Sequence, residues 1–187
     1  PPQAKRRDDQ QARPDHQPRD AVIGVEQADT VLDGEKLRDD ARRWKAFPDS
    51  VAALAALARR YRLIAMTNAR RWAFEAFEKE LGNPFHKSFT ADDTGTEKPD
   101  PAFFEQVFAS VESEGGAKND ILHVAQSQYH DIGVSRRLGM TNCWIERRHD
   151  RKGYGGTIEP AEFTKPDYHF TSMAGLAEAA GKAAGQA

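Results

Sequence analysis

Short apolar runs alternate with segments of helical periodicity over most of the chain. The runs predict buried strands at 63–66, 88–90, 121–125, 142–145 and 168–170. Between the strands, and after the last one, the pattern predicts helices at 72–81, 101–111, 132–138 and 173–180. Strands and helices that alternate in this way predict parallel βαβ units, and therefore a three-layer α/β sandwich with a mainly parallel sheet.

A further helix is predicted just before the first of these strands. Pro48 precedes Asp49 and Ser50, and either of these two residues suits the N-cap of a helix. Helical spacing then predicts one apolar face, made of Val51, Leu54, Ala55, Ala58 and Tyr61.

The first 46 residues lack this regular pattern. Residues 1–20 carry no large apolar side chain and mix both charge signs, so we predict a disordered tail there. Residues 21–25 are apolar and predict a brief strand, and 21–46 as a whole reads as a degenerate first strand with a linker. The regular core is expected to span 47–187.

Composition and charge restrict the classes of partner expected for this chain. Hydrophobic residues make up 39% and charged residues 30%, and the formal net charge is -2, so we expect neither a nucleic-acid partner nor a membrane surface. No apolar run approaches the roughly 20 residues that span a bilayer, and no secretory signal is visible. The one cysteine, Cys143, lies in an apolar run. It is predicted to be a buried core thiol in a protein of the reducing cytoplasm.

Polar residues follow three of the predicted strands. Thr67 and Asn68 follow the strand at 63–66, Lys98 stands before Pro99 after the second strand, and Asp131 follows the strand at 121–125. The carboxyl ends of parallel strands form the ligand-binding edge of such sheets, so these side chains are expected to converge on a small anionic substrate. Taken singly, each has a plainer interpretation as a turn residue, a loop lysine or a helix cap.

These motifs together resemble the haloacid dehalogenase superfamily, and most of all its type II haloacid dehalogenase-like branch. The resemblance covers roughly residues 45–182. It rests on Met66-Thr67-Asn68, on Lys98-Pro99-Asp100-Pro101, on the segment Gln126 to Asp131 (QSQYHD) and on the segment Trp144 to Arg151 (WIERRHDR). It implies a Rossmann-like hydrolase core and chemistry through a covalent ester on a carboxylate.

The resemblance also implies roles for individual residues. Thr67 and Asn68 would hold the substrate, Lys98 would orient the nucleophile and neutralise developing charge, and Asp131 would support the lysine and the hydrolytic water. Ser127 and Tyr129 are expected to contact the substrate. Gln126 stands where many phosphatases of the superfamily have a second acid, so no metal is expected. Magnesium is the alternative if the protein is a phosphatase.

The family pattern breaks at its first motif, which should supply a nucleophilic aspartate. Glu26 falls near that place and Asp29 is the other candidate, but neither fits the motif. The extra methylene of a glutamate would displace its carboxylate by about 1 Å, which can lower a rate on the order of a hundredfold. A family cap domain is expected to be absent or vestigial, because about 13 residues separate Asp33 from Phe47.

These departures leave several interpretations open. The chain is a hydrolase of 2-haloacids or of phosphate monoesters, or it is a non-catalytic binding domain of the same fold. It is expected to be a fragment, an alternative product of a longer gene or a diverged protein. Apolar surface that a cap domain would cover favours a homodimer.

Overall fold

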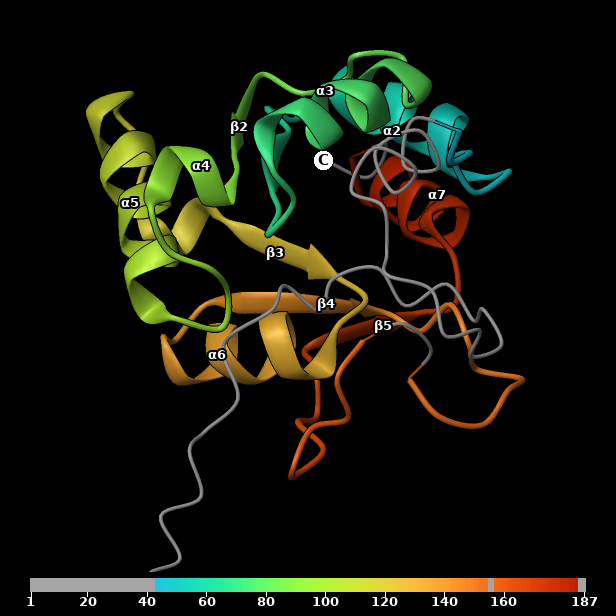
Figure 1. The fold of residues 1–187 in the computed structure, drawn as a ribbon. Helices are drawn as coiled ribbons and strands as arrows, with labels where there is room; N and C mark the ends of the chain where they lie inside the picture. Colours follow the sequence, from blue (N-terminus) through green and yellow to red (C-terminus); the bar gives the residue numbers. More distant parts are fainter. Residues whose placement is uncertain (1–42, 155–156, 185–187) are drawn as a thin grey trace, which may run out of the picture.

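The computed structural model describes residues 43–154 and 157–184. The tail predicted for 1–20, the strand predicted for 21–25 and the candidate nucleophiles Glu26 and Asp29 lie outside these residues. Figure 1 shows the described part as strands covered by helices.

The described strands form two parallel sheets. In the first, β1 (Ile64–Met66) pairs with β2 (Lys87–Phe89). In the second, β4 (Thr141–Ile145) lies between β3 (Leu122–Ala125) and β5 (Tyr168–Phe170). The prediction of an α/β fold built from parallel strands is confirmed.

No strand pairing joins β1 to β3 among the described residues, so each of these strands is paired along one edge. The backbone hydrogen bond from Thr67 to the carbonyl of Phe89 extends the pairing of β1 with β2. The carbonyl of Met66 instead accepts a hydrogen bond from the Lys98 side chain. A side chain therefore satisfies a backbone acceptor that a neighbouring strand would otherwise bind.

Helices cover the sheets. They are α2 (Ser50–Ala58), α3 (Arg71–Glu80), α4 (Ala91–Thr94), α5 (Pro101–Ser113), the 3₁₀ turn η1 (Lys118–Asp120), the π-helical turn η2 (Gln128–Ile132), α6 (Gly133–Arg137) and α7 (Met173–Ala184). Those predicted at 72–81, 101–111, 132–138 and 173–180 are present with similar bounds, whereas α4 and the turns η1 and η2 were not predicted.

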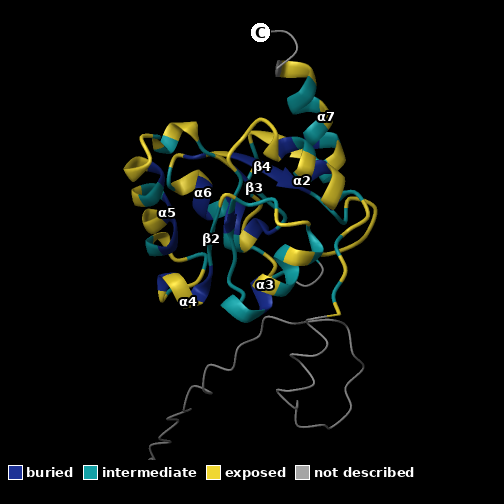
Figure 2. Cartoon of the chain, turned by 90° about the horizontal axis from the view of Figure 1, so that it is seen from above, coloured by how far each residue is buried: buried dark blue, intermediate teal, exposed yellow. Residues whose placement is uncertain are grey.

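Two apolar clusters form the core. One joins Phe103, Phe104 and Val107 of α5 to Val134 of α6 and Met140. The other contains these residues of α2, β4 and α7: Leu57, Cys143, Ile145 and Leu176. Helices thus pack on both sides of the strands, and Figure 2 shows the buried strands between exposed helical surfaces. The Cys143 thiol is fully buried as predicted, and burial raises its pKa to about 11.

The apolar face predicted for α2 is wrong. Val51 and Tyr61 are 41% and 49% exposed, whereas Ser50, Ala53 and Leu57 are buried. Small apolar residues occupy almost every position of this helix, so the sequence carries little information about which side faces the core.

Asp49 stands at the N-cap position of α2, as predicted, but its side chain makes no capping hydrogen bond to the helix. One carboxylate oxygen accepts from Arg147 at 2.6 Å, and the other accepts from the backbone N–H of Met173 at 2.8 Å. Asp49 therefore ties the start of α2 to the end of β4 and the start of α7.

The ionised form of Asp49 is favoured by these contacts. Burial alone would raise its pKa, but the hydrogen bonds from Arg147 and from the N–H of Ala174 outweigh burial and hold the pKa below its ordinary value.

None of the described helices is long and apolar enough to cross a membrane.

We expect Asp49→Ala to lower the free energy of unfolding by about 1–3 kcal/mol, because it leaves Arg147 and two backbone N–H groups without their acceptor. Denaturant titration at pH 7 measures the loss. Asp150→Ala is the control, because Asp150 is exposed and its nearest cation, Arg151, lies 3.9 Å away. Equal, small losses in the two variants would contradict the structural role of Asp49.

Candidate functional site

Lys98 lies at the centre of the polar residues that follow the strands. Its ammonium group donates to a carboxylate oxygen of Asp131 at 2.6 Å and to the carbonyl of Met66 at 2.9 Å. The side chain of Lys98 is 9% exposed and that of Asp131 is 7% exposed. The ion pair therefore connects the end of β1 to the loop that follows β3, within an interior that excludes most water.

Asn68 fixes the backbone of the lysine. Its side-chain oxygen accepts from the N–H of Lys98, and its amide nitrogen donates to the carbonyl of Lys98, both at 2.8 Å. The Lys98–Pro99 peptide bond is cis. Asn68 thus acts on Lys98 as a two-point clamp between the loop after β1 and the loop that precedes α5.

Thr67 is half-buried next to this clamp. Its hydroxyl accepts from the N–H of Ala69 at 3.1 Å, which leaves the hydroxyl proton available as a donor. The carbonyl of the preceding residue, Met66, accepts a hydrogen bond from the Lys98 ammonium group. Thr67, Asn68, Lys98 and Asp131 thus belong to one connected group at the carboxyl ends of the strands.

Asp131 has a second buried partner, His123 in the middle of β3. Nε2 of His123 lies 3.0 Å from the same carboxylate oxygen that Lys98 contacts, and His123 is 5% exposed. An ionised carboxylate only accepts hydrogen bonds, so Nε2 must carry the proton. Burial would raise the pKa of Asp131, but the charge of Lys98 and the hydrogen bond from His123 hold it well below its ordinary value.

His123 also packs in the core, because its ring lies edge-on to that of Phe104 with centroids 5.3 Å apart. Its hydrogen-bond partner is the candidate site carboxylate. The only sequence signal for this contact is a polar residue in an otherwise apolar strand that ends at the site.

Asp131 sits in the π-helical turn η2, a type of turn that is frequent at functional sites. Ser127 caps the turn, because its hydroxyl accepts from the N–H of His130 at 2.9 Å. Asp131 is therefore not simply a helix cap, because its carboxylate contacts Lys98 and His123. The Tyr129 ring is 38% exposed and lies edge-on to the His130 ring. Substrate contacts for Ser127 and Tyr129 remain predictions.

The described residues fit a magnesium ion poorly. Magnesium prefers several oxygen ligands, but no group of three or more His, Cys, Asp or Glu residues suited to a metal occurs among residues 43–154 and 157–184. One oxygen of Asp131 is already shared by Lys98 and His123. Gln126, at the position of a possible second acid, contributes its carbonyl to a hydrogen bond from Trp144.

A lysine ammonium group and a threonine hydroxyl can both bind negative charge. The described residues therefore form a protein of the α/β class with a candidate site for anions after its parallel strands. Ligands of such folds bind at the carboxyl ends of the strands.

The family model of haloacid dehalogenase-like hydrolases matches residues 5–132 of the chain. The chain therefore belongs to this family. The match begins well before residue 45, where the motifs of the sequence began to resemble the family, and it includes Glu26 and Asp29. None of the curated proteins matches the sequence.

Solved structures share the fold. An L-2-haloacid dehalogenase from Xanthobacter autotrophicus with covalently bound chloropropionic acid is 18% identical, with a TM-score of 0.64 over 79% of this chain and 67% of that one. A 2-haloacid dehalogenase from Pseudomonas syringae pv. Tomato DC3000 is 22% identical, with a TM-score of 0.60 over 79% and 58%. A HAD phosphatase from Thermococcus onnurineus is 22% identical, with a TM-score of 0.62 over 80% and 65%. The chain spans roughly three-fifths of such structures.

We expect Asp131→Asn to lower the free energy of unfolding at pH 7 by about 3 kcal/mol, because it leaves the Lys98 ammonium buried without a counter-charge. The pKa of Asp131 is lower in the folded than in the unfolded chain. Its contribution is therefore present above about pH 4 and is lost as the pH falls further. Denaturant titrations at pH 7 and pH 3 measure the difference in free energy of unfolding between the wild type and Asp131→Asn.

Asp92→Asn is the matched control, because Asp92 also pairs with a cation, Arg70, but on the exposed surface. Its effect at pH 7 should be much smaller. A difference between wild type and Asp131→Asn that stays constant from pH 7 to pH 3 would show that the charge of Asp131 is not what stabilises the fold.

Proposed function

We propose that this protein hydrolyses the carbon–halogen bond of small 2-haloacids. The observation that carries the proposal is the buried Lys98 ammonium, held by Asp131 beside the carbonyl of Met66. Membership of the haloacid dehalogenase-like hydrolases and the likeness of fold to the two dehalogenases support it.

The proposed reaction has two steps. A carboxylate oxygen of the protein attacks C2 of the substrate, a carbon–oxygen bond forms, and the halide leaves with the electrons of its bond. Water then attacks the carbonyl carbon of the resulting ester, which releases the 2-hydroxyacid and restores the carboxylate, with one proton passed to solvent. The attacking carboxylate is Glu26 or Asp29, both within the family match.

The candidate site residues have the following roles in this scheme. Lys98 neutralises the negative charge of the substrate and of the ester-forming step, and Asn68 holds its backbone in place. Thr67 offers its hydroxyl proton to the substrate carboxylate. Asp131 supplies the counter-charge of Lys98 and orients its ammonium group, and Ser127 and Tyr129 lie along the turn that carries Asp131.

Phosphate monoester hydrolysis is the alternative, since a HAD phosphatase shares the fold. The contacts of Asp131 favour the haloacid, because Lys98 and His123 both donate to one carboxylate oxygen and leave only the other for a metal ion. A binding domain without catalysis is the third candidate.

We also propose that the protein is cytoplasmic and forms a homodimer. Exposed apolar side chains such as Phe47 and Val51 are available for the dimer contact.

We expect the chain to release halide from 2-chloropropionate and Thr67→Val to lower kcat/KM at least about tenfold, because the variant lacks the donor to the substrate carboxylate. Thr67 makes a local hydrogen bond to Ala69, so the variant should fold. Thr141→Val, at the exposed start of β4, is the control and should keep its activity. Halide and phosphate release are scored with and without magnesium.

Glu26→Gln and Asp29→Asn identify the nucleophile, since only the variant that lacks the attacking carboxylate should lose turnover completely. Phosphate release that requires magnesium, with no halide release, would establish the phosphatase instead. A folded chain that releases neither product would overturn both activities and favour the binding domain.

A further inference from the structure

A cleft of about 410 Å³ lies beyond the carboxyl ends of β3 and β4. Its lining includes Gln126, which follows β3, and Trp144 of β4. Arg148, Arg151, Tyr154 and Phe163 line the remainder among others. None of the candidate catalytic residues Thr67, Asn68, Lys98 and Asp131 belongs to this lining. The volume lies within the range of small-molecule sites in proteins.

Trp144 gives the cleft a rigid aromatic wall. Its ring stacks on that of His169 with centroids 4.9 Å apart, and the ring of Phe163 lies edge-on to it at 5.6 Å. The indole N–H donates to the carbonyl of Gln126 at 2.8 Å, so this group is unavailable to a ligand. The wall can therefore offer ring surface, but no hydrogen bond from the indole.

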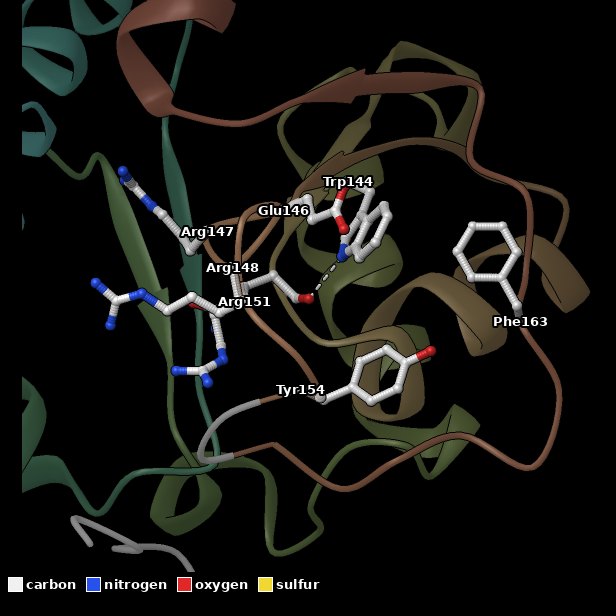
Figure 3. Close-up of a pocket in the computed structure, with 9 residues that line it drawn as sticks. Trp144, Glu146, Arg147, Arg148, Arg151, Tyr154 and Phe163 are labelled. Carbon is white, nitrogen blue, oxygen red and sulfur yellow. Dashed lines mark hydrogen bonds between the residues drawn. The ribbon is translucent and has the colours of Figure 1, made fainter.

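Phe163 belongs to the same wall but is 52% exposed. In Figure 3 the rings of Trp144, Tyr154 and Phe163 lie on one side of the close-up and the labelled arginines on the other. A flat apolar ring that enters the cleft would cover Phe163 from water and gain contact with fixed aromatic side chains.

The opposite side carries positive charge that the protein does not fully compensate. Arg147 is neutralised by Asp49 at 2.6 Å, and Glu146 contacts His169 at 2.8 Å. Arg148 differs, because no described carboxylate pairs with it. One of its terminal nitrogens donates to the carbonyl of Lys152, while its Nε is buried without a hydrogen-bond partner in the described part of the chain.

An unsatisfied buried donor is unfavourable, and an uncompensated guanidinium group favours an oxyanion. Arg151 adds a second cation to the lining, with Asp150 as a distant partner at 3.9 Å. Rearrangement of the Arg148 side chain around a bound anion would pair both its charge and its unused donor.

We propose that this cleft is a binding site for a small aromatic anion, a planar ring that carries a carboxylate or a phosphate group. The ring packs against Phe163 and Trp144, and the anion pairs with Arg148. The site is separate from the Lys98 group, so the proposal does not depend on the proposed catalytic activity.

Isothermal titration of the full chain with 2-naphthoate and with naphthalene-2-phosphonate tests the proposal and distinguishes the two anions. We expect one or both to bind, while the neutral 2-naphthamide and the non-aromatic cyclohexanecarboxylate bind at least about tenfold more weakly. Arg148→Gln should weaken binding roughly tenfold, and Phe163→Ala roughly threefold to tenfold. Arg148→Lys should restore part of the affinity.

Arg60→Gln, an exposed arginine just beyond α2, is the matched control and should bind as the wild type does. Thr67→Val should also bind normally, even if it loses turnover. The proposal is overturned if neither probe binds, if Arg148→Gln and Phe163→Ala bind as tightly as Arg60→Gln, or if the neutral amide binds as well as the anions. Each variant is compared with the wild type by circular dichroism before titration.

Discussion

The buried pair of Lys98 and Asp131 is the polar contact that joins the ends of the two described sheets, between which the described residues form no strand pairing. Lys98 reaches the last carbonyl of β1, and Asp131 stands on the turn that follows β3. Two well-packed apolar side chains would hold these loops with a smaller desolvation penalty. The buried charges are therefore expensive as a purely structural device, and the proposed anion site would account for them.

His123 and Asn68 make that pair rigid from opposite sides. His123 reaches Asp131 from inside β3, whereas Asn68 binds both backbone polar groups of Lys98 from the loop after β1. Neither contact needs substrate. The ammonium group is thus set in place before any ligand arrives, and such preorganisation is what makes electrostatic stabilisation effective in a site that excludes water.

The sequence predicted the strands and the convergence of Lys98 and Asp131 for simple physical reasons. Strands buried on both faces read as continuous apolar runs, and the carboxyl ends of parallel strands share one edge. The contacts of His123 and of Asp49 were not predictable, because each partner lies on another element and depends on how those elements pack. The buried side of α2 was predicted wrongly, because almost every position around this helix is apolar. The first motif stays a prediction, since Glu26 and Asp29 lie outside the described residues.

Charge compensation elsewhere in the molecule gives Arg148 its significance. Arg136 pairs with Asp167, Arg147 pairs with Asp49, and Glu114 is surrounded by Arg62, His86 and Lys87. Arg148 follows Arg147 directly in the chain, yet the described residues offer it no carboxylate. Its charge lies beyond the ends of β3 and β4, on the side of a parallel sheet where ligands bind. The other two partly buried arginines of the described residues, Arg71 and Arg147, each pair with a carboxylate, whereas Arg148 at that edge does not, so a bound anion can supply the missing partner.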